Sequence, residues 1–126
     1  MFLSILFLFT IYIQQDNWIL YQEHEKVEIS YKSHRCNDKK NGFDFEYYLI
    51  KIRNKTNETF VVNFYKGLEE NEEQKIAFVL KPFEVKTGTC KYDPVKLRIF
   101  KSDYSLKNNK KGDDFNLTKI DIIEVY

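Results

Sequence analysis

Residues 47–65 read YYLIKIRNKTNETFVVNFY and carry the strongest structural signal in the chain. Two runs of β-branched and aromatic residues enclose a polar hexapeptide, Asn54–Thr59, which contains neither Gly nor Pro. Such runs suit a pleated, half-buried surface and a polar break suits a turn, so the stretch predicts a β-hairpin. One face of each strand supplies the expected core: Tyr48, Ile50, Ile52, Phe60, Val62 and Phe64.

Short strands and turn-rich segments alternate on both sides of this stretch. Further strands are expected at Trp18–Tyr21 (an edge strand), Val27–Tyr31, Ile76–Leu80, Lys96–Phe100 and Leu117–Tyr126. Loops are expected at Lys32–Gly42, Lys66–Lys75 and Lys101–Asp114. About seven or eight short strands without a convincing amphipathic helix predict an all-β fold. The favoured architecture is an antiparallel Greek-key sandwich, and the alternative is a small barrel.

The composition fits one small domain. The chain has 126 residues, of which 43% are hydrophobic and 17% aromatic, so it has enough apolar material for a core. Its 20 basic residues nearly balance 19 acidic ones, which leaves a net charge of +1. That balance provides no electrostatic footprint for nucleic acid or for an anionic membrane surface.

The first fifteen residues, MFLSILFLFTIYIQQ, contain an apolar run from Phe2 to Ile13. The run is short of the roughly 20 residues that span a bilayer, and it suits the apolar region of a secretory signal peptide. We therefore expect a signal peptide at 1–15, a single β-sandwich domain at 16–126, and a secreted or periplasmic protein with no membrane span after signal removal. Because no Lys or Arg precedes the run and no small-x-small site follows it, a first strand or a retained anchor is the alternative.

Cys36 and Cys90 are the only cysteines in the sequence, and they form no CxxC pair. In an exported protein an even number of cysteines favours disulfide bonding, and two cysteines allow a single intramolecular pairing. The sequence therefore predicts a Cys36–Cys90 disulfide.

Five stretches occur in a characteristic order: Trp18, VEISYKSHRC (27–36), YYLIKIRNKTNETFVVNF (47–64), KPFEVKTGTC (81–90) and LRIF (97–100). Their order resembles that of small exported immunoglobulin-like sandwich proteins of Gram-negative bacteria, which mostly lack an assigned activity. The resemblance implies an immunoglobulin-like sandwich fold and export, and it implies no function.

Candidate reactive groups do not combine into a catalytic or metal site. Ligand types occur together at His34–Asp38 and at Glu23–Glu25, but zinc usually takes four ligands and a disulfide sulfur cannot serve as one. The acidic stretch Glu69–Glu73 lacks the spacing of an EF-hand loop and the environment that separates carboxyl pKa values. There is no G-x-S-x-G motif. We therefore expect no metal, no cofactor and no enzymatic activity.

Several polar and aromatic positions are candidates for contact with a partner. Asn54, Asn57 and Asn116 each begin an N-x-Thr sequon, although Asn and Thr also favour turns. Exposed aromatic residues are favoured at interfaces, so a possible interface includes Tyr47, Tyr65 and Tyr104. The alternative is that such tyrosines cap the ends of the core with their hydroxyls in water.

These observations favour a non-enzymatic exported binding or structural module that acts at the cell envelope through sheet faces or loops, on a protein or glycan partner. The alternative is an inhibitor or immunity-type protein that blocks an enzyme with a loop such as Lys101–Asp114.

Overall fold

The computed structural model describes residues 17–68, 70–91, 94–104, 110–111 and 114–125, and the expected signal peptide lies outside these ranges. The described part is all-β, as predicted, and none of its helices is long and apolar enough to cross a membrane. Turns of 3₁₀ helix form at Lys39–Asn41 and Glu72–Gln74. The strands are β1 (Ile19–Glu23), β2 (Val27–Asp38), β3 (Phe43–Asn54), β4 (Phe60–Lys66), β5 (Lys75–Leu80), β6 (Val85–Thr87), β7 (Arg98–Asp103), β8 (Lys110–Lys111) and β9 (Leu117–Glu124).

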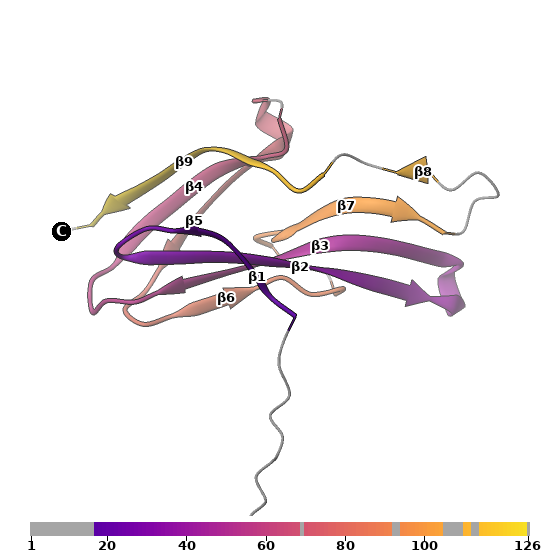
Figure 1. The fold of residues 1–126 in the computed structure, drawn as a ribbon, viewed down its shortest axis with the longest axis horizontal. Helices are drawn as coiled ribbons and strands as arrows, with labels where there is room; N and C mark the ends of the chain where they lie inside the picture. The colour runs from indigo at the N-terminus through magenta and orange to yellow at the C-terminus, as the bar shows by residue number, and fades with distance from the viewer. Residues whose placement is uncertain (1–16, 69, 92–93, 105–109, 112–113, 126) are drawn as a thin grey trace, which may run out of the picture.

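Two antiparallel sheets form the molecule. Sheet A has six strands in the order β1-β2-β3-β7-β8, and β6 also pairs with β3. Sheet B has three strands in the order β5-β4-β9. Figure 1 shows β9 and β4 in a layer above β2 and β3, and it shows the β2–β3 hairpin extending to the right beyond sheet B. The result is a sandwich in which one end of sheet A projects.

The predicted hairpin at residues 47–65 is wrong. Its two strands are β3 and β4, which belong to different sheets and do not pair with each other. The hexapeptide Asn54–Thr59 therefore forms an arch that carries the chain from sheet A to sheet B. Buried Asn54 lies at the start of this arch, where its amide bonds to two backbone carbonyls.

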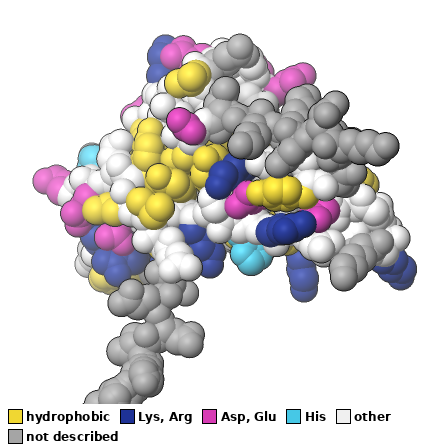
Figure 2. Space-filling view, turned by 45° about the vertical axis from the view of Figure 1, so that its right-hand side comes forward, with side chains coloured by type: hydrophobic (Ala, Val, Ile, Leu, Met, Phe, Trp, Pro, Cys, Tyr) yellow, Lys and Arg dark blue, Asp and Glu magenta, His cyan; other side chains and the backbone are white. Residues whose placement is uncertain are grey.

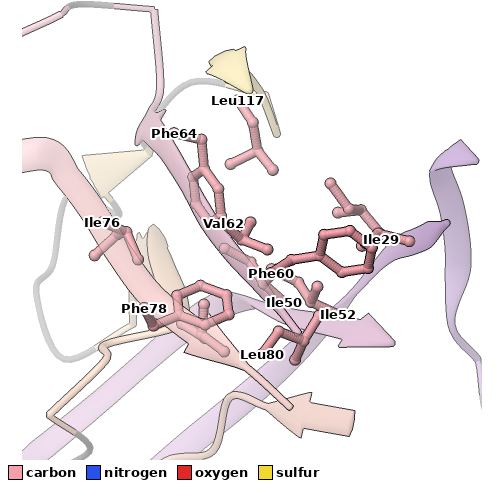
Figure 3. Packing of buried hydrophobic residues seen from close by; sticks show 12 residues of the cluster. Ile29, Ile50, Ile52, Phe60, Val62, Phe64, Ile76, Phe78, Leu80 and Leu117 are labelled. Carbon is pink, nitrogen blue, oxygen red and sulfur yellow. The ribbon is translucent and has the colours of Figure 1, made fainter. Parts of the chain in front are cut away.

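The predicted core is correct, because an arch directs the same apolar faces inward as a hairpin would. Five of the six expected core residues are at most 1% exposed, and Tyr48 is 9% exposed. Figure 3 shows side chains of β4 facing Ile29, Ile50 and Ile52 of sheet A. Burial of each such side chain contributes about 1.5–3 kcal/mol, so this interface between the sheets is the main source of stability. Sheet B adds Ile76, Phe78, Leu80 and Leu117 to the cluster.

The predicted loop Lys32–Gly42 is also wrong over most of its length. Strand β2 continues to Asp38 and pairs with β3 residue by residue, so that Asp38 lies opposite Phe43. Cys36 is therefore a strand residue. The other predicted strands correspond to observed ones, and β7 extends to Asp103, inside the segment that was expected to be a loop. Residues 105–109 and 112–113 of that segment lie outside the described residues.

Gly88 occupies the point where β6 ends, and the backbone there leaves no room for a side chain. Its N–H donates to the carbonyl of Ile50 (2.8 Å), and the Ile50 N–H donates to the carbonyl of Leu97 (3.0 Å). A Cβ atom on residue 88 would overlap that Leu97 carbonyl oxygen. The chain therefore approaches itself here at a distance that only glycine permits.

Gly88→Ala should lower the free energy of unfolding by about 1–3 kcal/mol, because the backbone around Leu97 must move and its bond to Ile50 weakens. Urea denaturation followed by circular dichroism measures the change. The neighbouring exposed Thr87→Ala is the control and should change stability by no more than about 0.5 kcal/mol. Equal denaturation midpoints for the two variants would contradict this account of Gly88.

Candidate functional site

The outer face of sheet A, which points away from sheet B, combines aromatic rings with cationic side chains. Side chains alternate along a strand, and directly paired residues share a face. On β3 the outward positions include Tyr47, Leu49 and Lys51, because Ile50 and Ile52 point into the core. The register then places His34 of β2 beside Tyr47 and Lys32 beside Leu49 on this same face.

Four aromatic side chains lie in contact on this face toward the projecting end of sheet A. Phe43, Phe45 and Tyr47 follow one another at alternate positions of β3, and Phe100 lies beside them on β7. Ring centroids are 5.4 Å apart for Phe43–Phe45, 6.1 Å for Phe45–Phe100 and 6.5 Å for Tyr47–Phe100. We call these four residues the aromatic strip. Its rings are not deeply buried: Phe43 is 51% exposed and the others are half-buried.

Cationic side chains lie over aromatic rings on the same face. The Lys32 and Lys51 ammonium groups lie 4.7 and 4.9 Å from the centre of the Trp18 ring. The Arg98 guanidinium lies 4.6 Å from the centre of the Tyr47 ring. Within the described residues, no carboxylate forms an ion pair with Lys32 or Lys51. Each contact is worth about 0.5–1 kcal/mol at an exposed site, and together they hold positive charge on an aromatic surface.

The predicted Cys36–Cys90 disulfide is present and borders this surface. Its Cα atoms are 5.5 Å apart. Cys36 lies on β2, whereas Cys90 lies between β6 and β7, which pair with the opposite edge of β3. The bridge therefore ties the β6–β7 loop across the outer side of β3. Arg98 strengthens this attachment, because its guanidinium donates to the Cys90 carbonyl (2.9 Å).

An open groove runs along the disulfide. It is lined by His34, Arg35, Cys36, Asn37, Asp38, Cys90 and Lys91. The groove brings one imidazole close to both sulfurs: the ligand atoms of His34, Cys36 and Cys90 all lie within 4.8 Å of one another. His24 lies elsewhere, in the β1–β2 turn, where its Nδ1 accepts a hydrogen bond from the Lys26 N–H (3.1 Å).

The opposite, inner side of the projecting hairpin carries a network of charged and polar groups. Arg35 donates two hydrogen bonds to Asp44, of 2.8 and 2.6 Å, and its guanidinium lies over the Tyr104 ring. The Tyr104 hydroxyl donates to Glu46 (2.7 Å), and this bond to a carboxylate raises the pKa of Tyr104. Figure 2 shows acidic and basic side chains interspersed on the right, where this end of the molecule lies. The groups satisfy one another, so the network is structural.

The three tyrosines of the expected interface lie on three separate surfaces. Tyr47 belongs to the aromatic strip, and Tyr104 to the network on the inner side of the hairpin. Tyr65 lies on sheet B, where the Lys75 ammonium is 6.0 Å from its ring centre. The structure therefore does not bring them together into one site.

Several of the remaining sequence candidates have local structural roles. Asn54 is buried with its amide bonded, so the first sequon belongs to the packed part of the arch, whereas Asn57 in the same arch is exposed. In the acidic stretch, Glu70 pairs with Lys119 (3.2 Å) and Glu72 begins a 3₁₀ turn, while residue 69 lies outside the described residues.

No protein-family model, curated protein or solved structure matches this chain.

Sequence reasoning missed the aromatic strip, although a usable signal was present. The sequence Phe43-Asp44-Phe45-Glu46-Tyr47 alternates aromatic and acidic residues with a period of two. That period predicts a strand with an aromatic face and an acidic face. The structure has this arrangement, with the strip on one side and the carboxylates bonded to Arg35 and Tyr104 on the other. The contributions of Phe100, Trp18 and Arg98 depend on pairing and loop packing, which local sequence does not reveal.

Proposed function

We propose that this chain is a non-enzymatic exported binding module that contacts an acidic protein surface at the cell envelope through the outer face of sheet A. The observation that carries the proposal is the set of half-exposed rings with cations held over them. Aromatic residues and Arg are the side chains enriched in protein interfaces, and positive charge steers an acidic partner toward its site. A broad sheet face that carries several half-exposed rings offers a wide contact area, which suits a protein better than a narrow sugar chain.

We assign an immunoglobulin-like Greek-key topology, and the repeated crossing between sheets, from β3 to β4, from β5 to β6 and from β8 to β9, supports it. Export through a signal peptide at residues 1–15 is supported by the disulfide, because such bonds persist in oxidising compartments.

Charge reversal on this face should abolish most of the binding. We expect Lys32→Glu/Lys51→Glu to reduce the amount of an acidic envelope protein captured by immobilised residues 16–126 by about tenfold or more at low salt. Capture by the wild-type chain should fall as salt is raised, because exposed charges are screened. Quantitative mass spectrometry of proteins eluted from solubilised envelopes provides the measurement.

The matched control is Lys75→Glu/Lys119→Glu, which makes the same change in net charge on sheet B. It should capture the same protein as the wild type. Equal capture by both variants would refute the outer face as the binding surface. Recovery of an acidic polysaccharide in place of a protein would refute the protein partner and show that the chain binds a glycan. Recovery of one enzyme in a one-to-one complex that is inhibited by the chain would favour an inhibitor.

A further inference from the structure

The cluster of His34, Cys36 and Cys90 has the composition of a soft-metal site whose sulfurs are currently bonded to each other. His34 and Cys36 are two residues apart and therefore project from the same side of β2. Cys90 approaches from the β6–β7 loop, and all three ligand atoms lie within 4.8 Å of one another. Two thiolates and one imidazole are a ligand set that zinc sites use, with water as the fourth ligand.

We infer that the reduced chain binds zinc through the two cysteine sulfurs and the His34 imidazole, and that the oxidised chain does not. A dithiol reductant supplies two electrons and two protons to the disulfide and is itself converted to a disulfide, which leaves thiols at Cys36 and Cys90. Zinc then displaces the two thiol protons to solvent and bonds to both thiolates. The oxidation state of Cys36 and Cys90 thus decides whether two thiolates are available to bind zinc.

The geometry requires only small movements. Zn–S distances of about 2.3 Å and Zn–N distances of about 2.0 Å place the donor atoms of a tetrahedral site roughly 3.5–3.8 Å apart. The His34 nitrogen must move inward by about 1 Å and the sulfurs must separate by a similar amount or somewhat more. His34 is exposed and the groove beside it is open, so side-chain rotation can provide these shifts.

The backbone positions of the ligands do not depend on the S–S bond alone. Cys36 is held by the ladder between β2 and β3. The Cys90 carbonyl accepts from Arg98, and the following Lys91 N–H donates to the Thr89 hydroxyl (3.2 Å). The reduced chain should therefore keep the three ligands near one another.

Selectivity follows from the sulfur ligands. Thiolates bind zinc, cobalt and cadmium in preference to magnesium or calcium, which take oxygen ligands. Metal binding here is independent of the proposed protein partner, and its failure would leave that proposal intact.

Cobalt and zinc titrations of the reduced protein test this inference. Residues 16–126 are reduced with a phosphine, freed of reductant by gel filtration under argon, and titrated with Co²⁺. We expect thiolate-to-cobalt charge-transfer absorption at one equivalent, loss of that absorption when zinc is added, and no such absorption from the oxidised protein. Circular dichroism at each stage reports whether the chain is folded.

Variants separate this site from adventitious binding. Cys36→Ser/Cys90→Ser lacks the bridge as the reduced protein does, and it should show no charge-transfer absorption. His34→Ala should bind zinc more than tenfold more weakly in competition with a chromophoric chelator, because a direct ligand is lost. His24→Ala is the control and should match the wild type. The inference is overturned if the reduced wild type binds zinc no better than the serine variant. It is equally overturned if reduced His34→Ala binds zinc as tightly as the reduced wild type. Both outcomes count against the inference whether or not the reduced chain is folded.

Discussion

Removing the Cys36–Cys90 bridge should lower the free energy of unfolding by about 4 kcal/mol. The two cysteines are separated by 54 positions in the sequence, so the bridge closes a long loop and greatly restricts the unfolded chain. Small domains have a net stability of about 5–15 kcal/mol, and the bridge therefore accounts for a large share of it. Urea denaturation of the oxidised wild type and of Cys36→Ser/Cys90→Ser measures this difference.

The folded state of the serine variant should nevertheless retain its sheets. Neither sulfur belongs to the core cluster, which lies between β2 and β3 on one side and sheet B on the other. We expect an unchanged far-ultraviolet circular dichroism spectrum in the absence of urea. A loss of stability below about 1 kcal/mol would mean that the unfolded chain is already compact around this loop, contrary to the entropic account. Loss of the β-sheet spectrum would show that the bridge maintains the sandwich itself.

The sequence predicted which residues are buried more reliably than which strands pair. Residues 47–65 have the same alternation of apolar and polar side chains in a hairpin as in an arch. A hairpin places Ile50 and Val62 on the same side of one sheet, and an arch places them on facing sides of two sheets. Both bury the same set, so periodicity identifies the core without distinguishing the two arrangements. Their difference lies in long-range pairing: β3 pairs with β2, β6 and β7, and β4 pairs with β5 and β9.

Strand β2 shows why polar strands are hard to predict. Its second half, Ser33–Asp38, is polar because it projects beyond sheet B and has no core to cover. Backbone pairing with β3 and the bond between Arg35 and Asp44 hold it as a strand. A composition typical of a loop therefore occurs in a regular ladder. The same pairing places Phe43, Phe45 and Tyr47 on one outer face, and it makes Cys36 a strand residue two positions from His34.

Asn54→Ala should destabilise the fold by about 3 kcal/mol, because the Asn54 side chain joins three segments of the chain at the arch. It is only 1% exposed. Its amide nitrogen donates to the carbonyls of Glu58 (2.6 Å) and Lys81 (2.9 Å). Its oxygen accepts from both the N–H and the hydroxyl of Thr56, at 2.9 and 2.8 Å. Alanine leaves these groups without partners in a part-buried environment, which costs about 1–3 kcal/mol for each buried group that stays unsatisfied.

The isosteric Asn54→Asp variant separates hydrogen bonding from packing. Aspartate keeps the acceptor for Thr56 but places a second oxygen against the carbonyls of Glu58 and Lys81, where the wild type has a donor. At pH 7 it should be at least as destabilising as alanine, since a buried carboxylate there would face two carbonyl oxygens. At pH 4 part of the loss should be recovered, because a protonated carboxyl group can donate to one of the carbonyls. Thermal denaturation at both pH values measures this difference, with each variant compared with the wild type at the same pH.

The exposed Asn57 provides the matched control within the same arch, and Asn57→Ala should change stability by no more than about 0.5 kcal/mol. If Asn54→Ala were equally mild, the arch would be held by its backbone alone, through bonds such as that from the Lys55 N–H to the Lys26 carbonyl (3.0 Å). If Asn54→Asp were neutral at pH 7, water would have to reach the carboxylate, and residue 54 would not be the buried connection between the two sheets. A large loss of stability in both Asn54 variants, with no measurable loss in Asn57→Ala, would establish that one buried amide directs the chain from sheet A into sheet B.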